Sequence, residues 1–380
     1  MQLIRGGVHR DLRVDFFRGL ALWWIFTDHI PGNVLGKWSL RNFALCDAAE
    51  MFVLLAGYGA GLAYGGTLRR RGWLHGAAAC VRRAWTLYIA HIFLFAVFAA
   101  QVGISAAKLT RPEYVSQSLL GPMGTRPYEA LLHALLLHYQ PSLLNILPLY
   151  MVVLLMFAAM LPLLARPRLL WVLSIGIYAA ARLFRFNLPS WTGGGWFFDP
   201  FAWQLLFVAG ALLAHDAVPV PRRKWPFDVV AGLLVLFGVL VTFIAYWIPR
   251  VGFWMPLPVV HALRSIDKTT LDPLRLASIA ALSWGVVRLV PRQARWLRRR
   301  LATPFVLAGQ HSLPVFCWSI FLGFFGRVGL DWAPGVWMQL LVNLGGGVAL
   351  ACVAAVAAWY GRPDPTAAKP AVAGPSTRSR

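Results

Sequence analysis

Ionisable side chains open and close the first apolar stretch of the chain, "RVDFFRGLALWWIFTDHIPG" at 13–32. Asp15 and Arg18 stand at its start, and Asp28 and His29 stand at its end. Such groups cost roughly 2.5–3.5 kcal/mol each in hydrocarbon. They therefore either flank the membrane-spanning segment or have a functional role within it. Near pH 7, imidazole accepts a proton from an attacking hydroxyl better than a carboxylate or a guanidinium does. His29 is therefore the best single candidate for a general base.

Helical geometry places these groups on one face. Arg18 and His29 are eleven residues apart, about 20° past three full turns, and about 16 Å apart along the axis. Asp15 falls on the edge of the same stripe, which favours a polar stripe facing the interior of a bundle. Two alternatives remain: Arg18 as a snorkelling topology residue, and His29 as an interfacial residue beside the helix-ending Pro31.

Two carboxylates, Asp47 and Glu50, are three residues apart at the start of the second apolar stretch and share a helix face. Glu50 is the candidate to orient the His29 imidazole and stabilise its protonated form. Asp47 fits a solvated rim carboxylate or cavity residue. Further along the same stretch, glycines at 57, 61 and 65 predict close helix packing, in preference to a cavity lining.

Two arginines, Arg82 and Arg83, stand at the predicted start of the third span. Guanidinium suits bidentate contact with phosphate, but a topological role explains the pair equally well. His91 lies deeper in that span, either as a hydrogen-bonded core residue or as part of a cavity.

Uncharged polar groups also interrupt apolar stretches. Gln310, His311 and Ser312 lie in the predicted ninth span, where polar groups are costly unless partnered, so we expect them to line a cavity. "WTGGGWFFDPFAWQ" brings Trp203 and Gln204 to the predicted outside mouth. Aromatic faces beside polar groups suit sugar rings, although interfacial aromatic belts have the same composition.

The composition of the chain indicates a membrane protein. The 380-residue chain is 59% hydrophobic and 13% charged, which is too apolar for an ordinary soluble domain. Its net charge of +22 is spread between apolar spans and forms no single basic face, so it indicates membrane topology and no nucleic-acid partner. The four cysteines have neither metal-ligand spacing nor a disulfide pattern, and we expect no metal.

Apolar stretches of about 17–25 residues predict an all-α, polytopic bundle of about ten transmembrane helices. They lie near 16–35, 47–66, 83–104, 143–164, 168–186, 199–215, 226–248, 273–290, 303–325 and 335–358. The segment "YEALLHALLLHYQ" in the connection 105–142 predicts a short interfacial or re-entrant helix. We expect one integral-membrane domain over 1–360 and a disordered cytoplasmic tail over 361–380.

Lysine and arginine are distributed unequally between the two sides of this arrangement. One side, which includes both termini, carries 24 of them and the other carries 12. The positive-inside rule therefore predicts that both termini are cytoplasmic. His29 then lies towards the outside of the membrane, and Arg18 towards the cytoplasm.

Several blocks resemble a known family. Arg13-x-Asp15-x-x-Arg18 with a histidine eleven residues after Arg18 is similar to the first-span signature of the membrane acyltransferase-3 superfamily. "FFRGLALWWIFTDHIPGN", "RNFALCDAAEMFVLLAGY", "NILPLYM", "WFFDPFAWQLLFVAGA" and "LAGQHSLPVFC" resemble OpgC-type osmoregulated periplasmic glucan succinyltransferases, in order from residue 13 to about 317. Ala56 departs from the superfamily, which has serine there, and so does Thr86, where a second arginine is expected.

The resemblance implies a multi-pass enzyme of the bacterial inner membrane. It would take an acyl group, typically succinyl, from cytosolic acyl-CoA to a hydroxyl of a periplasmic glucan, without a permanently bound cofactor. By motif position, His29 would be the essential histidine and Arg18 its companion arginine. Glu50, seven residues before Gly57, falls where the superfamily has an acidic residue ahead of its Ser-Gly pair. Arg18, Asp15, Arg82 and Arg83 would serve the donor.

A transporter is the opposing class of function. Ten spans with intramembrane charges would also suit an exporter of an anionic glycan or lipid-linked precursor. No internal hydropathy symmetry of the kind common in transporters is visible, so we favour the enzyme. The sequence predicts contacts with membrane lipid and leaves direct transfer, a covalent acyl-histidine and the oligomeric state open.

Overall fold

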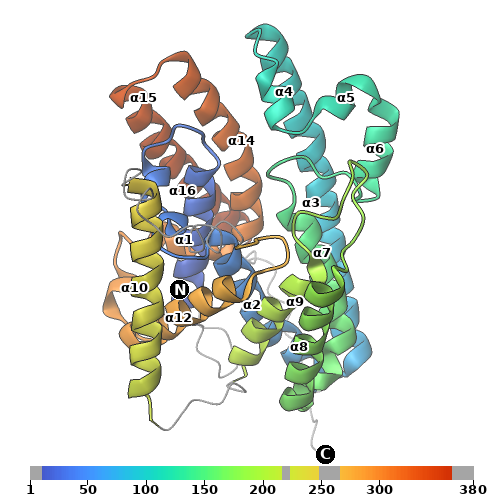
Figure 1. Cartoon of the computed structure of the whole chain (residues 1–380), viewed down its shortest axis with the longest axis vertical. Coiled ribbons are helices and arrows are strands. Elements are labelled where there is room, and N and C mark those ends of the chain that lie inside the picture. Colours follow the sequence, from blue (N-terminus) through green and yellow to red (C-terminus); the bar gives the residue numbers. More distant parts are fainter. Residues whose placement is uncertain (1–10, 216–222, 248–265, 362–380) are drawn as a thin grey trace, which may run out of the picture.

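A computed structural model describes residues 11–215, 223–247 and 266–361 of the chain (Figure 1). Within these ranges the regular structure is helical, apart from one isolated β-bridge between Pro189 and Gly195. The helices are α1 (Leu12–Asp28), α2 (Ala48–Arg71), α3 (Trp73–Lys108), α4 (Glu113–Gln117), α5 (Gly121–Thr125), α6 (Pro127–Leu135), α7 (Ile146–Met160), α8 (Pro167–Phe184), α9 (Pro200–Leu213), α10 (Trp225–Trp247), α12 (Pro273–Leu289), α13 (Thr303–Gln310), α14 (Ser312–Trp332), α15 (Val336–Leu340) and α16 (Gly346–Tyr360). The predicted all-α class is confirmed.

Seven helical segments in the described part are long and apolar enough to cross a membrane. They are Ala48–Arg71, Trp73–Lys108, Ile146–Ala165, Pro167–Phe184, Trp225–Thr242, Ser312–Trp332 and Val336–Tyr360. The other three predicted spans contain helices that are shorter, α1 and α12 with 17 residues each and α9 with 14. The chain is a membrane protein, while ten crossings and cytoplasmic termini remain predictions. The predicted tail lies outside the described residues, except for Gly361.

Helices α1 and α2 lie between two groups of helices (Figure 1). Helix α1 packs on α2, α13 and α14, and α2 packs on α3 and α9. Helices α7 and α8 cover α3 and α9, whereas α10 pairs with α12 and α16 packs on α13 and α14. The two helices with the most candidate chemistry therefore lie in the middle of the bundle.

Glycines let these helices meet backbone to backbone. A Cβ added at Gly19 would overlap the carbonyl of Phe305 on α13, and one added at Gly309 would overlap the carbonyl of Asp15 on α1. On α2, a Cβ added at Gly57 would overlap the carbonyl of Phe207 on α9. A Cβ added at Gly61 would lie only 2.7 Å from the carbonyl oxygen of Ala211, also on α9. The close packing predicted for the α2 glycines is confirmed.

Three predicted boundaries are wrong, and for two of them the reason is a nearby proline. Helix α1 ends at Asp28 and does not reach residue 35, because Pro31 and the left-handed Gly32 (φ 78°) follow it. Helix α3 begins at Trp73, ten residues before the predicted start. The predicted ninth span is two helices broken at His311, because Pro314 has no N–H to continue α13 and its ring excludes the carbonyl four residues earlier.

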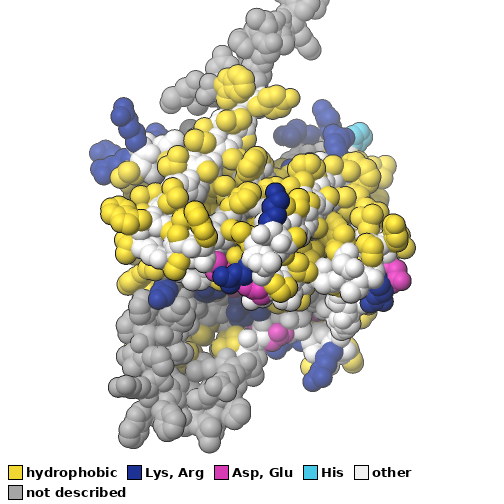
Figure 2. All heavy atoms as spheres, turned by 90° about the horizontal axis from the view of Figure 1, so that it is seen from above, with side chains coloured by type: hydrophobic (Ala, Val, Ile, Leu, Met, Phe, Trp, Pro, Cys, Tyr) yellow, Lys and Arg dark blue, Asp and Glu magenta, His cyan; other side chains and the backbone are white. Residues whose placement is uncertain are grey.

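Hydrophobic side chains cover most of the described surface seen from above, with Lys and Arg scattered among them (Figure 2). The predicted short helix between the third and fourth spans is present as α6. Its Ala130 and Ala134 are buried, whereas Tyr128 and Leu132 are 88% and 55% exposed. An apolar face turned outward suits a helix lying at a membrane surface.

Candidate functional site

The end of α1 presents His29 as the helix cap. Its backbone N–H donates to the carbonyl of Ile25 at 3.1 Å, so the side chain leaves the helix on the last turn. The imidazole is half-buried, and its Nδ1 is buried with no hydrogen-bond partner among the described residues. The charges of Lys268, Asp47 and Arg41 act on it electrostatically. An imidazole nitrogen without a partner can accept a proton from a substrate hydroxyl that reaches it.

Four charged side chains, Asp47, Glu50, Lys268 and Arg275, meet at the same end of the bundle; we call them the charge cluster. Arg275 donates from Nε to Glu50 Oε1 at 2.6 Å and from an Nη to Asp47 Oδ2 at 3.1 Å. Lys268 Nζ lies 2.5 Å from the same Asp47 oxygen. Glu50 is fully buried and the Arg275 side chain is 12% exposed. Two cations thus balance two carboxylates, and Lys268, with a side chain that is 30% exposed, is the most accessible of the four.

The beginning of α2 explains the position of the two carboxylates. Asp47 is the N-cap, and its Oδ1 accepts from the Ala49 N–H at 2.8 Å. Glu50 completes the capping box by accepting from the Asp47 N–H at 2.9 Å. The other Glu50 oxygen faces Arg275, so Glu50 takes Arg275 as its partner and makes no hydrogen bond to His29 among the described residues.

A fixed turn after residue 265 carries the cations. Asp267 accepts from the backbone N–H groups of Thr269 and Thr270 at 2.9 and 2.8 Å. Burial raises the pKa of the Asp267 carboxyl, but the hydrogen bonds from Thr270 and Thr269 outweigh it and hold the pKa below its usual range. The buried Trp203 donates from Nε1 to the carbonyls of Lys268 and Thr269, each at 3.1 Å. The turn is therefore anchored to α9.

The start of α12 sets the place of Arg275. Asp272 caps the helix by accepting from the Leu274 N–H at 2.9 Å, and Pro273 occupies the first turn. Arg275 consequently projects from the first turn of α12 towards α2. Asp272 also pairs with Arg182 of α8 at 3.4 Å, which joins the start of α12 to α8.

Arg18 and Asp15 lie in the contacts between helices. Arg18 donates to the carbonyl of Leu55 on α2 at 2.5 Å and to that of Gly309 on α13 at 3.4 Å. Asp15 is 3% exposed and accepts from the Gln310 side chain at 3.2 Å. These bonds join α1 to α2 and α13, which gives Arg18, Asp15 and Gln310 a packing role whether or not they meet a ligand.

Arginines gather where α2 ends and α3 begins. Arg82 is exposed and Arg83 half-buried, in the third turn of α3 and not at its start. A hollow of about 240 Å³ is lined by Thr67, Arg70 and Arg71 at the end of α2. This end of the bundle lies a full length of α2 away from the charge cluster.

Of the remaining candidates, only Asp28 among the described residues lies beside His29. His91 is fully buried, and neither ring nitrogen has a hydrogen-bond partner among the described residues. Gln204 is also buried and exchanges hydrogen bonds with Ser174 of α8 at 2.7 and 2.8 Å, so it joins α8 to α9. His311 and Ser312 are half-buried at the break between α13 and α14. Asp28 pairs with Arg41 at 3.4 Å beside His29.

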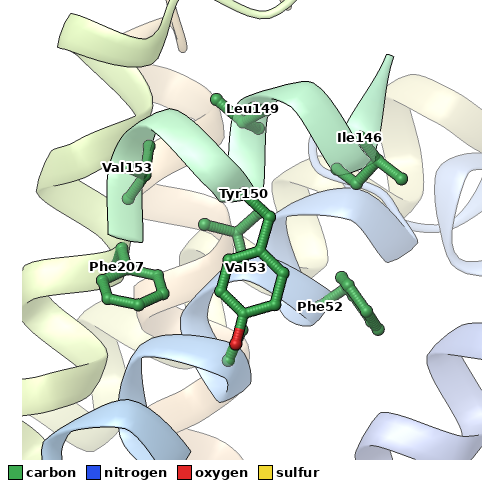
Figure 3. A pocket seen from close by; sticks show the side chains of 8 residues that line it. Phe52, Val53, Ile146, Leu149, Tyr150, Val153 and Phe207 are labelled. Atoms are coloured by element: carbon green, nitrogen blue, oxygen red, sulfur yellow. The ribbon is translucent and has the colours of Figure 1, made fainter. Parts of the chain in front are cut away.

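An apolar slot opens between α2, α7 and α9, just beyond the first turn of α2 (Figure 3). Its lining is Phe52, Val53, Ala56, Ile146, Leu149, Tyr150, Val153 and Phe207. Ala56, where the resemblance leads one to expect serine, faces this slot. The slot lies near the charge cluster, but its volume of about 10 Å³ leaves no room for an acyl chain.

Comparison with known proteins decides the family. A family model described as "OpgC protein" matches residues 10–362, which is nearly the whole chain. This chain belongs to the OpgC family. Neither a search of curated proteins nor a search of solved structures found a match. Membership of the OpgC family indicates an acyltransferase-type membrane enzyme.

Two site residues of this OpgC-family chain escaped the sequence reasoning. Lys268 and Arg275 belong to the charge cluster, yet neither was among the candidates. The signal was present for Arg275, because it lies inside a predicted span, where an ionisable group suggests function as it did for Arg18. For Lys268 no local signal exists, because its place in the cluster depends on its contact with Asp47, which lies 221 residues earlier in the chain.

Proposed function

We propose that the protein is a membrane O-acyltransferase that moves a succinyl group from acyl-CoA to a hydroxyl of a periplasmic glucan, with His29 as the general base. The observation that carries this proposal is the half-buried His29 imidazole, with its unpartnered Nδ1, beside the charge cluster. Family membership supports the class of reaction. The acyl group, the donor and the glucan come from the resemblance of the sequence blocks.

The proposed topology has ten crossings and both termini in the cytoplasm. Helices α2 and α12 both run from the charge cluster towards basic residues in their last turns, 69–71 in α2 and Arg288 in α12. With these basic residues inside, the His29 end faces the periplasm of a bacterial inner membrane. Acyl-CoA then reaches the arginines Arg70, Arg71, Arg82 and Arg83 from the cytoplasm, where guanidinium groups suit its phosphates.

The proposed chemistry is a direct transfer. The His29 imidazole takes the proton of the glucan hydroxyl while the hydroxyl oxygen bonds to the thioester carbon. The carbon–sulfur bond then breaks, and the proton passes from His29 to the leaving CoA thiolate. General-base assistance of this kind is worth roughly 10²–10⁴-fold in rate.

Export of an anionic glycan or lipid-linked precursor is the alternative function. The match to the OpgC family does not favour it. An exporter needs no acyl donor, so the two functions differ in whether CoA thiol is released in the presence of glucan.

The test uses purified protein with succinyl-CoA and a periplasmic glucan. We expect release of CoA thiol and a glucan mass increased by succinyl groups, and we expect both to disappear in His29→Ala. His75→Ala is the matched control, because His75 is exposed near the opposite end of α2. An active His29→Ala variant that is folded overturns the mechanism, and a wild-type protein that transfers from no acyl-CoA overturns the enzyme proposal.

A further inference from the structure

Three cations lie at or near the His29 end of the bundle and are candidates to bind an anionic substrate group. They differ in how many carboxylates they already contact and in how exposed their side chains are. Arg275 contacts two carboxylates and its side chain is 12% exposed. Arg41 is paired with Asp28, and its side chain is 48% exposed. Lys268 contacts one carboxylate with a side chain that is 30% exposed, and it is one of the charged groups that act electrostatically on His29.

Lys268 combines a fixed backbone with an accessible ammonium group. Trp203 and Asp199 bond the carbonyls of Lys268 and Thr269, so the turn itself is anchored. The ammonium has three N–H donors, and Asp47 is its one hydrogen-bond acceptor among the described residues. The Phe198 ring lies 5.5 Å from Nζ and closes one side.

Asp47 does not depend on Lys268 alone. Its Oδ2 also accepts from Arg275 at 3.1 Å, and its Oδ1 accepts from the Ala49 N–H. Asp47 therefore stays paired and capped when the Lys268 ammonium turns to a substrate. Arg275 has no such freedom, because Glu50 is fully buried and would be left without its cation.

We propose that Lys268 is a specificity-determining residue that binds the free carboxylate of a dicarboxylic acyl donor while its thioester carbon lies at His29. The inference rests on the acyl transfer proposed above and identifies the acyl class that the site selects. An ammonium on a flexible stem contributes a point charge, which matches a terminal carboxylate and has nothing to bind in a neutral acyl chain.

The experiment compares succinyl-CoA with butyryl-CoA, whose chain has the same number of carbons but ends in a methyl group. For the wild type we expect a clear preference for succinyl-CoA in kcat/KM. In Lys268→Met we expect kcat/KM for succinyl-CoA to fall about 10- to 100-fold relative to that for butyryl-CoA, the size of a charge-assisted hydrogen bond. Lys268→Arg should keep most of the preference, and it also serves as the test if Lys268→Met does not fold.

Lys108→Met is the matched control, because Lys108 is an exposed lysine at the end of α3. An equal loss with both donors in Lys268→Met would mean that Lys268 only supports Asp47, and would overturn the inference. A wild-type protein that uses both donors equally, or a Lys268→Arg variant without preference, would do the same and leave acyl transfer standing. Absence of transfer from every acyl-CoA would instead refute the proposed function.

Discussion

Removal of the Arg275 guanidinium should destabilise the protein more than removal of any exposed arginine. In Arg275→Met, the fully buried Glu50 loses the cation that lies 2.6 Å away, and Asp47 keeps only Lys268. Breaking a buried ion pair by removing one partner costs about 3–5 kcal/mol, because the remaining charge is left uncompensated. We expect a fall in the free energy of unfolding of that size, measured by thermal or denaturant unfolding of the detergent-solubilised protein.

Arg288→Met is the matched control for this loss. Arg288 makes an equally direct pair with Asp228, at 2.9 Å, but the two side chains are 41% and 37% exposed. An exposed pair of this kind contributes about 0–1 kcal/mol. The comparison separates burial from the presence of an ion pair.

A double variant tests the cause. Glu50→Gln should restore part of the stability that Arg275→Met removes, because the unpaired buried charge disappears along with its partner. Equal losses in the Arg275 and Arg288 variants, or a double variant that loses the sum of the two single losses, would refute the reasoning from burial.

Two further substitutions test the packing around α1. Gly309→Ala should lower the melting midpoint, because the added Cβ overlaps the Asp15 carbonyl and overpacking costs about 1–3 kcal/mol. Gly285→Ala on α12 is the control and should leave the midpoint unchanged, because no atom lies within 4 Å of its added Cβ. Similar midpoints for the two variants would refute the contact at Gly309. Arg18→Gln should lower the melting midpoint through its lost bonds to Leu55 and Gly309, whereas an unchanged midpoint with a raised KM for acyl-CoA would assign Arg18 to the donor alone.

Local patterns in the sequence were sufficient for α1 and for the beginning of α2. The spacing of Asp15, Arg18 and His29 depends only on helical periodicity, and the structure has a helix from Leu12 to Asp28 with His29 as its cap. Asp47 and Glu50 form a capping box, which we did not predict, although it depends only on neighbouring residues. Such features can be predicted because the interacting groups lie within a few turns of one another.

Long-range pairing could not be predicted in the same way. We expected Glu50 to serve His29, but the structure pairs it with Arg275 on a helix 225 residues later in the chain. Gln204, expected at the mouth, is buried against Ser174 for the same reason. Helix periodicity gives the face on which a side chain lies, but the partner on that face depends on which helices pack together.

The distance along the chain between the members of the charge cluster also bears on how the protein is made. Asp47 and Glu50 are synthesised 221–228 residues before the lysine and arginine that they contact. Until α12 has entered the membrane, the two acidic groups at the start of α2 lack their cations, and the His29 end is incomplete. During biogenesis, Asp47 and Glu50 are therefore in place before Lys268 and Arg275 can pair with them. A chain that stops before Lys268 and α12 leaves both carboxylates without the cations that balance them.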